Sequence, residues 1–436
     1  MKYFSTRDKD RKHGFSLRQA AFMGLAPDGG LFIPEYIPKA DLDTVEKLAD
    51  ISYADMAVYL AGLIFPDEVS HSELDAMIRK ACDFPCPLRK MEDDIYTLEL
   101  FHGPTFAFKD FGGRFMGGML GLLNEDDGSD LTVLTATSGD TGSAVANGFY
   151  DVPGVKVVVL YPEGKVSPIQ ESQMTTLGKN IFPVRVRGSF DDCQALVKAI
   201  FNDKEFRAGH NVTSANSINL LRWVPQSFYY FYAWAQWKKE HSDIAPDIVV
   251  PSGNYGNITA GMLAQKMGLP VRRWIAASNA NDVVPAFLRS GKYVPRASVR
   301  TPANAMDVGA PSNFERMMEL YSHDFQELSA AVSGYSCDDG QIYQGIRDIY
   351  RCCGGYVSDP HSAIGYNAAK AFGIRGFYLS TAHSAKFGEV IRKALAEELA
   401  ADGRDIEMPE RLRLAMEKPK SYVTIDNDIE MLKKLI

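Results

Sequence analysis

The chain has 436 residues and a formal net charge of −8, with 46% hydrophobic and 23% charged residues. This length suits two or three domains, and the composition is that of a folded globular protein rather than a disordered, collagen-like or coiled-coil chain. The acidic balance argues against a general nucleic-acid-binding protein, which usually carries a basic face. It does not exclude an anionic small-molecule ligand, because a pocket needs only local positive groups.

Three further features bear on the cellular compartment. No stretch approaches the ~18 consecutive apolar residues of a membrane span. The N-terminus mixes basic with acidic residues and runs into a turn, which is a poor signal peptide. Six cysteines without paired metal-type spacing predict reduced thiols rather than disulfides or a metal site. We therefore expect a cytoplasmic protein with no membrane insertion and no bound metal.

Apolar and β-branched runs alternate with helical patterns from residue 131 onwards. The first ninety residues instead predict helices with turns, and the tail after Glu389 is expected to be mainly helical. Such alternation predicts parallel βαβ units and an open α/β sheet, whose ligands bind at the carboxyl ends of the strands. The expected strands are 131–134, 155–161, 181–186, 247–250 and 271–277, and the expected helices are 143–150, 168–177, 191–201, 218–239 and 257–267.

The segment from Gly103 to Phe111 sets one lysine, Lys109, among three phenylalanines just after a Gly-Pro turn. An apolar setting lowers the pKa of a lysine because burial penalises the ammonium, and a neutral amine can attack an aldehyde or act as a base. On these residues alone, a surface lysine whose stem lies on aromatic rings is an equally good interpretation.

Two further segments lie between a predicted strand and a predicted helix. Residues 135–143 hold five hydroxyls and two glycines, and amides at a helix start can bind a carboxylate or phosphate, although any single hydroxyl there can be an ordinary helix cap. Residues 251–257 place Gly253 and Gly256 so that backbone amides can turn toward one anion. A plain tight turn is the alternative, and the spacing is neither a P-loop nor the dinucleotide fingerprint.

Two more segments bring charged groups to loops. Residues 216–222 open an aromatic helix, where Ser217 and Arg222 can approach one anion, the arginine through its planar guanidinium. A helix cap followed by a solvated arginine is the alternative. Residues 379–386 end a predicted strand in hydroxyls, a histidine and Lys386, each of which alone is typical of an ordinary loop.

Taken together, these segments resemble the long-chain threonine synthases, within the tryptophan-synthase-β-like (fold type II) class of pyridoxal-phosphate enzymes. The resemblance covers most of the chain and includes residues 28–34, 164–168 and 173–177. Each motif is weak alone, whereas their order and number are specific. The resemblance implies an α/β architecture of two open α/β-sheet domains, with the cofactor pyridoxal 5′-phosphate in the cleft between them, and an N-terminal helical region.

By analogy with the family, we expect an N-terminal region at residues 1–95 and a large cofactor-binding domain at 96–124 and 206–436. Residues 125–205 would form a small α/β domain that closes on the large one. The expected oligomeric state is a monomer or a homodimer.

The resemblance also assigns residues to the cofactor. Lys109 would carry it as a Schiff base, and Thr381 would face its pyridine nitrogen. Asp140 would lie beside its 3′ oxygen, where related enzymes often have asparagine. The loop that would hold its phosphate contains Gly253, Asn254, Tyr255, Gly256 and Asn257.

The family's reaction converts O-phospho-L-homoserine and water into L-threonine and phosphate. Lys109 would remove the α proton and serve in later proton transfers. The β proton would then leave, phosphate would be eliminated from the γ carbon, and water would add at the β carbon. The residues expected to bind this substrate are Ser138 and Thr141, with Asn216, Ser217 and Arg222 at its phosphate.

Three alternatives remain open at the level of sequence. A threonine or serine dehydratase-like lyase would use Lys109 and the glycine-rich loop equally, but its substrate needs no second anion site such as Ser217 with Arg222. A catalytically inactive relative that binds a phosphorylated ligand is a second alternative, which the presence of both Lys109 and Thr381 disfavours. The absent dinucleotide fingerprint counts against the third, an oxidoreductase.

Overall fold

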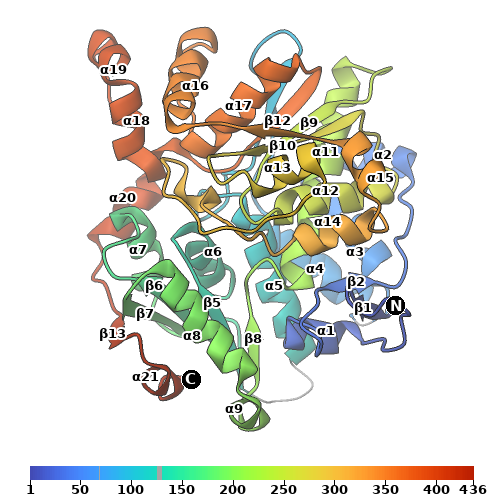
Figure 1. Cartoon of the computed structure of the whole chain (residues 1–436), viewed down its shortest axis with the longest axis vertical. Coiled ribbons are helices and arrows are strands. Elements are labelled where there is room, and N and C mark those ends of the chain that lie inside the picture. Colours follow the sequence, from blue (N-terminus) through green and yellow to red (C-terminus); the bar gives the residue numbers. More distant parts are fainter. Residues whose placement is uncertain (68, 125–129) are drawn as a thin grey trace.

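The computed structural model describes residues 1–67, 69–124 and 130–436, which form two main sheets with helices packed around them (Figure 1). In the larger sheet, neighbouring strands run parallel except for β3, which pairs antiparallel with β4 at one edge. Its strands in spatial order are β11 (Val332–Ser336), β10 (Arg273–Ser278), β9 (Asp247–Pro251), β12 (Gly376–Ser380), β4 (Ile95–Glu99) and β3 (Leu88–Lys90).

The smaller sheet is parallel throughout its described strands. Every residue of β5 and nearly every residue of β6 is buried, as expected for strands that are covered on both faces. The predicted α/β fold with two open sheets is therefore confirmed. In spatial order the strands are β13 (Val423–Asp426), β7 (Ile181–Arg187), β6 (Val155–Pro162), β5 (Leu131–Ala136) and β8 (Val212–Ser214).

Helices connect the parallel strands, and at each of the five predicted positions a helix begins within three residues of the predicted start. The predicted helix 218–239 is, however, divided into α10, a 3-10 turn and α11. Pro225 lies in that turn and has no backbone N–H to continue an α-helix. These helices are α5 (Lys109–Asn124), α6 (Asp140–Gly148), α7 (Pro168–Thr175), α8 (Phe190–Asn202), α9 (Lys204–Gly209), α10 (Leu220–Trp223), η1 (Val224–Ser227), α11 (Phe228–Glu240), α12 (Gly256–Lys266), α13 (Val283–Ser290), η2 (Asn304–Met306), α14 (Phe314–Leu320), α15 (Phe325–Ala331), α16 (Asp339–Cys352), α17 (Pro360–Phe372) and η3 (Ser384–Phe387).

The N-terminal region is helical as predicted, but it also contains a short antiparallel sheet. In that sheet Tyr3 pairs with Pro34, which brings the start of the chain beside the turn at residues 28–34. Figure 1 shows this region on the side of α5 away from the smaller sheet. Its elements are β1 (Tyr3–Ser5), α1 (Leu17–Met23), β2 (Phe32–Pro34), α2 (Leu42–Ile51), α3 (Tyr53–Ile64) and α4 (His71–Ala81).

The C-terminal tail departs from the purely helical expectation. Residues 423–426 form β13, which extends the smaller sheet by pairing with β7. In Figure 1 the red tail descends from α19 past α20 to β13 and α21, beside the smaller sheet. The helices of the tail are α18 (Gly388–Ala394), α19 (Ala396–Asp402), α20 (Glu410–Glu417) and α21 (Ile429–Lys433).

The sheets do not follow the predicted domain limits at every point. Strands β8 and β13 belong to the smaller sheet although they lie outside 125–205, and β3 belongs to the larger sheet although it lies within 1–95. The division into mobile domains stays a prediction.

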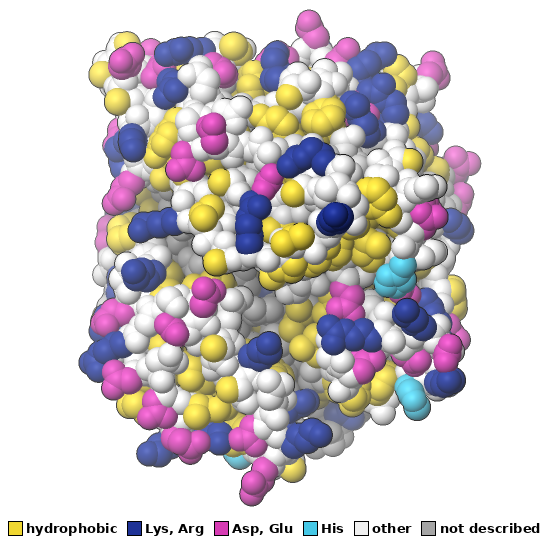
Figure 2. All heavy atoms as spheres, in the orientation of Figure 1, with side chains coloured by type: hydrophobic (Ala, Val, Ile, Leu, Met, Phe, Trp, Pro, Cys, Tyr) yellow, Lys and Arg dark blue, Asp and Glu magenta, His cyan; other side chains and the backbone are white. Residues whose placement is uncertain are grey.

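Among the described helices, none combines the length and the apolar character that a membrane span requires. Acidic and basic side chains both occur over much of the face drawn in Figure 2.

Candidate active site

The segment that carries Lys109 pairs through its backbone with the segment that carries Thr381. Ala107 and Ala382 form an isolated antiparallel bridge, and Phe108 N donates to the Thr381 carbonyl at 2.8 Å. Thr381 follows β12, and Lys109 opens α5, so both lie at the carboxyl edge of the larger sheet. The structure therefore brings Lys109 and Thr381 into one neighbourhood, as predicted.

Lys109 is partly buried, and its ammonium lies 5.9 Å from the centre of the Phe108 ring. Burial lowers its pKa to about 8, because desolvation penalises the charged form and the positive charges of Lys386 and Arg222 add to that effect. The negative charge of Asp140 opposes the shift. A substantial fraction of Lys109 is therefore the neutral, nucleophilic amine near pH 8.

Asp140 stands at the start of α6, where its carboxylate is buried and paired. Lys386 Nζ lies 2.6 Å from Asp140 Oδ1, and Gln170 Nε2 donates to the same oxygen at 2.9 Å. Burial opposes ionisation, but the charges of Lys386 and Lys109 outweigh it, so the pKa of Asp140 is well below its usual value. Neither Lys386 nor Gln170 was among the predicted site residues, although Lys386 was noted in the segment 379–386, because the neighbours of these two residues in the chain give no signal that they contact Asp140.

The turn before Lys109 is tightly constrained. The buried Asp110 carboxylate accepts from the backbone N–H of Thr105 at 2.8 Å and from its hydroxyl at 2.6 Å. Between these residues, Phe106 has a φ of 59°, a left-handed conformation that is unfavourable for a bulky residue. Strained backbone of this kind persists where surrounding contacts determine it, and it is common at functional sites.

In the loop after β5, the hydroxyls of Ser138 and Thr141, which are predicted to bind substrate, are available to bind a ligand. Thr137 Oγ1 accepts from the N–H groups of Gly139 and Gly142 at 2.9 and 2.8 Å, so it shapes the turn. Ser138 and Thr141 are partly buried, and their hydroxyls make no hydrogen bond to the residues that the structure describes. The hydroxyl cluster thus divides into a structural member and two unengaged members.

The loop from Gly253 to Asn257 follows β9 and begins α12. Tyr255 adopts a left-handed φ of 60°, while its buried hydroxyl lies 2.5 Å from the Ser278 hydroxyl. The Asn257 side chain is also engaged locally, since it accepts from Ser252 at 2.6 Å and donates to the Pro251 carbonyl at 2.8 Å. Any contact of these two residues with an anion would therefore use backbone groups.

The predicted substrate-phosphate segment lies beside this loop. Asn254 Nδ2 donates to the Ser217 hydroxyl at 2.6 Å, and a Cβ on Gly256 would lie 3.2 Å from Ser217 Cβ. Asn216 accepts from the Thr135 hydroxyl at 2.7 Å, which ties the segment to the end of β5.

Arg222 is buried, contrary to the alternative of a solvated arginine. Its Nη1 donates to the Ala215 carbonyl at 2.7 Å, whereas its buried Nε has no hydrogen-bond partner among the described residues. Burial lowers the pKa of Arg222 to about 10, while Asp110 opposes the shift. A buried cation with an unused donor is costly unless an anion completes it.

Comparison with known proteins decides the family. The family described as "Pyridoxal-phosphate dependent enzyme" matches residues 85–376, while "Threonine synthase N terminus" and "Threonine synthase, C-terminal" match 2–82 and 362–436. Threonine synthases from Haemophilus influenzae and Escherichia coli are 42% and 41% identical to the chain, covering 99% and 100% of it and 99% of each relative. The chain belongs to the threonine synthase family.

Solved structures of threonine synthase share its architecture. The crystal structure of the Escherichia coli enzyme has a TM-score of 0.90 and 41% identity, and the match covers 100% of this chain and 99% of that one. A threonine synthase from Brucella melitensis, described as bound to pyridoxal phosphate, has a TM-score of 0.91 and 33% identity over 100% and 98% of the two chains. The fold type II architecture predicted from the sequence is thus that of threonine synthases.

The chain's own geometry suits the cofactor of the threonine synthase family. Lys109 offers an amine whose pKa is lowered to about 8, and such an amine can condense with an aldehyde. The loop at Gly253 lets backbone approach closely, because a Cβ there would lie 2.6 Å from Met306 Cα. Backbone amides at a strand-to-helix turn such as this one, between β9 and α12, can bind a phosphate.

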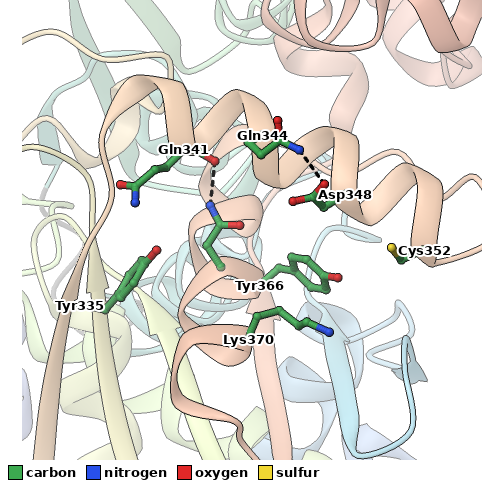
Figure 3. Close-up of a pocket in the computed structure, with 8 residues that line it drawn as sticks. Tyr335, Gln341, Gln344, Asp348, Cys352, Tyr366 and Lys370 are labelled. Atoms are coloured by element: carbon green, nitrogen blue, oxygen red, sulfur yellow. Dashed lines mark hydrogen bonds between the residues drawn. The ribbon is translucent and has the colours of Figure 1, made fainter.

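A separate hollow of about 350 Å³ does not include any residue predicted for the threonine synthase site. It lies between α16, α17 and β11, with Tyr335, Cys352 and Lys370 on its wall (Figure 3). Its polar groups bind one another, as in the hydrogen bond of 2.7 Å from Gln344 to Asp348. The hollow therefore supplies no argument for catalysis.

Proposed function

We propose that the chain catalyses the threonine synthase reaction, in which O-phospho-L-homoserine and water become L-threonine and phosphate. Membership of the threonine synthase family, which the relatives share over the full length of the chain, supports this proposal. The observation that carries the choice of substrate is Arg222, a buried guanidinium whose Nε lacks a partner among the described residues. A phosphorylated substrate would supply the missing anion, and charge-assisted hydrogen bonds of this kind are strong.

Lys109 would hold pyridoxal phosphate and act as the general base. When bound, the cofactor withdraws electrons from the substrate's α carbon and so makes the α proton easier to remove. The Lys109 amine can accept that proton because its pKa of about 8 leaves much of it neutral at a mildly alkaline pH. The same amine can return protons later in the reaction.

The remaining residues would bind and orient. Ser217 and Arg222 would hold the substrate phosphate, with Asn216 fixing the segment through Thr135. Ser138 and Thr141 would bind the amino-acid portion with hydroxyls that have no hydrogen-bond partner among the described residues. Phosphate would then leave from a position that faces Arg222, whose charge stabilises the departing oxygen.

Two other activities compete with this proposal. A dehydratase-like lyase would need Lys109 and the loop at Gly253 but no second anion site, so the unused Nε of Arg222 disfavours it. An inactive ligand-binding relative would not need an amine of lowered pKa, so the lysine environment disfavours that alternative.

An absorbance and product assay tests the proposal. The purified chain is supplied with pyridoxal phosphate and then with O-phospho-L-homoserine, and visible absorbance, phosphate and threonine are measured together. We expect absorbance that depends on Lys109, and phosphate and threonine in equal amounts. Lys109→Ala should abolish both. Absorbance without threonine would reject the substrate, and absence of bound cofactor would reject the central role of Lys109.

Arg222 provides the sharper test of substrate class. Arg222→Met should raise KM for O-phospho-L-homoserine by about 10-fold to 100-fold, because one or two charge-assisted hydrogen bonds are lost. The affinity of Arg222→Met for pyridoxal phosphate should stay near that of the unsubstituted chain. A matched loss of cofactor affinity would assign Arg222 to the cofactor instead.

We also propose that the protein works in the cytoplasm as a monomer or a homodimer. All six cysteines are free, which fits a reducing compartment. Analytical ultracentrifugation over a range of concentrations distinguishes the two assemblies, and a larger assembly would contradict the proposal.

A further inference from the structure

A buried lysine to which the proposed reaction has so far assigned no role joins the two halves of the candidate active site. The Lys386 side chain has no exposed surface, and its Nζ lies 2.6 Å from Asp140 Oδ1 and donates to the Thr105 carbonyl at 2.9 Å. Asp140 begins α6 beside the smaller sheet. Thr105 lies in the loop that follows β4 of the larger sheet, and Lys386 lies in η3, which follows β12 of that sheet. One ammonium therefore links the loops of both sheets.

Both acceptors of Lys386 are also bound by amides of α7. Gln170 Nε2 donates to Asp140 Oδ1 at 2.9 Å, and Gln173 Nε2 donates to the Thr105 carbonyl at 3.1 Å. The carboxylate and the loop carbonyl thus have fixed partners from two directions. This is a buried network rather than a solvated surface ion pair, so its geometry is well determined.

We propose that Lys386 is a positioning residue of the active site, whose ammonium holds the Asp140 carboxylate against the Thr105 loop and sets the charge that faces Lys109. The inference rests on the proposed role of Lys109 in the reaction. An acidic residue beside a catalytic amine would otherwise pair with that amine and keep it protonated. Lys386 takes the place of Lys109 as the partner of the carboxylate.

The charges around Lys109 give this role a definite sign. The charge of Asp140 in α6 acts on Lys109, as do the charges of two cations, Lys386 in η3 and Arg222 in α10, while the buried Asp110 is its neighbour in α5. Burial and the two cations lower the pKa of Lys109, whereas Asp140 raises it. Removal of Lys386 alone leaves Asp140 to favour the ammonium, so the pKa of Lys109 should rise. Removal of the Asp140 charge should lower it.

Chemical labelling reads the protonation of Lys109 without any turnover. The full chain, freed of cofactor, is acetylated with a trace of acetic anhydride across a range of pH, and the labelled fraction of Lys109 is measured by mass spectrometry. Only the neutral amine reacts, so the midpoint of labelling follows its pKa. The variants are Lys386→Met, Lys386→Arg and Asp140→Asn. The matched control is Lys370→Met, which removes a surface lysine that is paired with Glu92.

We expect the midpoint of Lys386→Met to rise by about 1 pH unit or more, in line with the effect of a nearby charge. Lys386→Arg keeps the cation and should stay within a few tenths of the unsubstituted chain, as should Lys370→Met. Asp140→Asn should move the midpoint downward. An unchanged or lowered midpoint in Lys386→Met would overturn the proposal, because a merely structural lysine would not set the charge at Lys109.

In Lys386→Met the buried carboxylate of Asp140 loses its partner, and this variant can fail to fold for that reason. A double variant keeps the test decisive in that case. Asp140→Asn combined with Lys386→Met has no such carboxylate, and its midpoint should lie above that of Asp140→Asn, since one repelling cation is gone. Equal midpoints would reject the proposal.

Kinetics separates this inference from the proposed function. In Lys386→Met, kcat should fall by about tenfold or more at neutral pH, because a higher pKa leaves less of Lys109 neutral to act as the base. KM should change less, because the substrate-binding residues are intact. Lys386→Arg should recover most of kcat. If the unsubstituted chain forms no threonine, the proposed function fails, while the order of the labelling midpoints still decides the role of Lys386.

Discussion

The Asn254 side chain donates a hydrogen bond to the Ser217 hydroxyl at 2.6 Å. The two residues come from different segments, one proposed for the cofactor phosphate and the other for the substrate phosphate. Asn313 Nδ2 also donates to the Ser217 hydroxyl, at 3.1 Å. The two proposed anion sites therefore share a polar contact, and a change at Ser217 should be felt at both.

Ser217→Ala removes the acceptor for these two amides. Each lost hydrogen bond is worth about 1 kcal/mol, so we expect the Kd of pyridoxal phosphate and the KM of O-phospho-L-homoserine each to rise about 5-fold to 10-fold. Fluorescence titration and steady-state kinetics measure the two constants. Ser329→Ala, at a half-buried position in α15 where the hydroxyl hydrogen-bonds within its own helix, is the control and should change neither. A rise in KM alone would show that the two sites are independent.

The sequence predicted much of this arrangement, and the reasons are physical. Strands β5, β6 and β9 are rich in apolar and β-branched residues, the loops after β5 and β9 each hold two glycines, and parallel strands bring such loops to one edge. The burial of Lys386 and the pairing of β13 with β7 could not be predicted in this way. Both depend on contacts between residues that are far apart in the chain, for which local pattern gives no signal. The turn at Pro225 was missed by the predicted helix 218–239, although the proline was a signal that could have indicated it, since proline interrupts a helix.

Gly253→Ala tests the close approach of backbone in the proposed cofactor-phosphate loop. The added Cβ would lie 2.6 Å from Met306 Cα, and backbone cannot yield as a flexible side chain can. We expect the affinity for pyridoxal phosphate to fall by about tenfold or more, measured by equilibrium titration of the visible absorbance.

Gly62→Ala is the matched control for this substitution. A Cβ there meets no atom of the described residues within 4 Å, and the residue lies inside α3. It should raise the free energy of unfolding by about 0.5 to 1 kcal/mol without changing cofactor affinity. Equal cofactor affinity in both variants would remove Gly253 from the proposed phosphate loop.

The lowered pKa of Lys109 predicts how cofactor capture depends on pH. Below its pKa of about 8 the amine is protonated and cannot attack an aldehyde, and above that pH it is neutral. The rate at which the cofactor-free chain takes up pyridoxal phosphate should therefore increase as pH rises through about 8 and then level off. Stopped-flow absorbance measures this rate, with free Nα-acetyl-lysine as the reference. A midpoint near that of the reference would mean that burial does not tune Lys109.

The spacing of Lys109 and Asp140 depends on a close contact between α5 and α6. Gly113 lies one turn after Lys109, and a Cβ on it would come 2.7 Å from the carbonyl oxygen of Ala144, one turn after Asp140. Gly113→Ala must therefore push the two helices apart. We expect a loss of about 1 to 3 kcal/mol in the free energy of unfolding, as for other overpacked sites.

The same displacement should reach the chemistry, because it moves Asp140 relative to Lys109. In Gly113→Ala we expect kcat to fall by about tenfold to a hundredfold, since small misplacements of catalytic groups are costly. Gly121→Ala is the control in the same helix, where a Cβ meets, among residues 1–67, 69–124 and 130–436, only Val152 Cγ1 at 3.1 Å, which is part of a side chain. It should leave kcat unchanged. Loss of stability in Gly113→Ala with full kcat would mean that the α5–α6 contact supports the fold but does not set the spacing of the two residues.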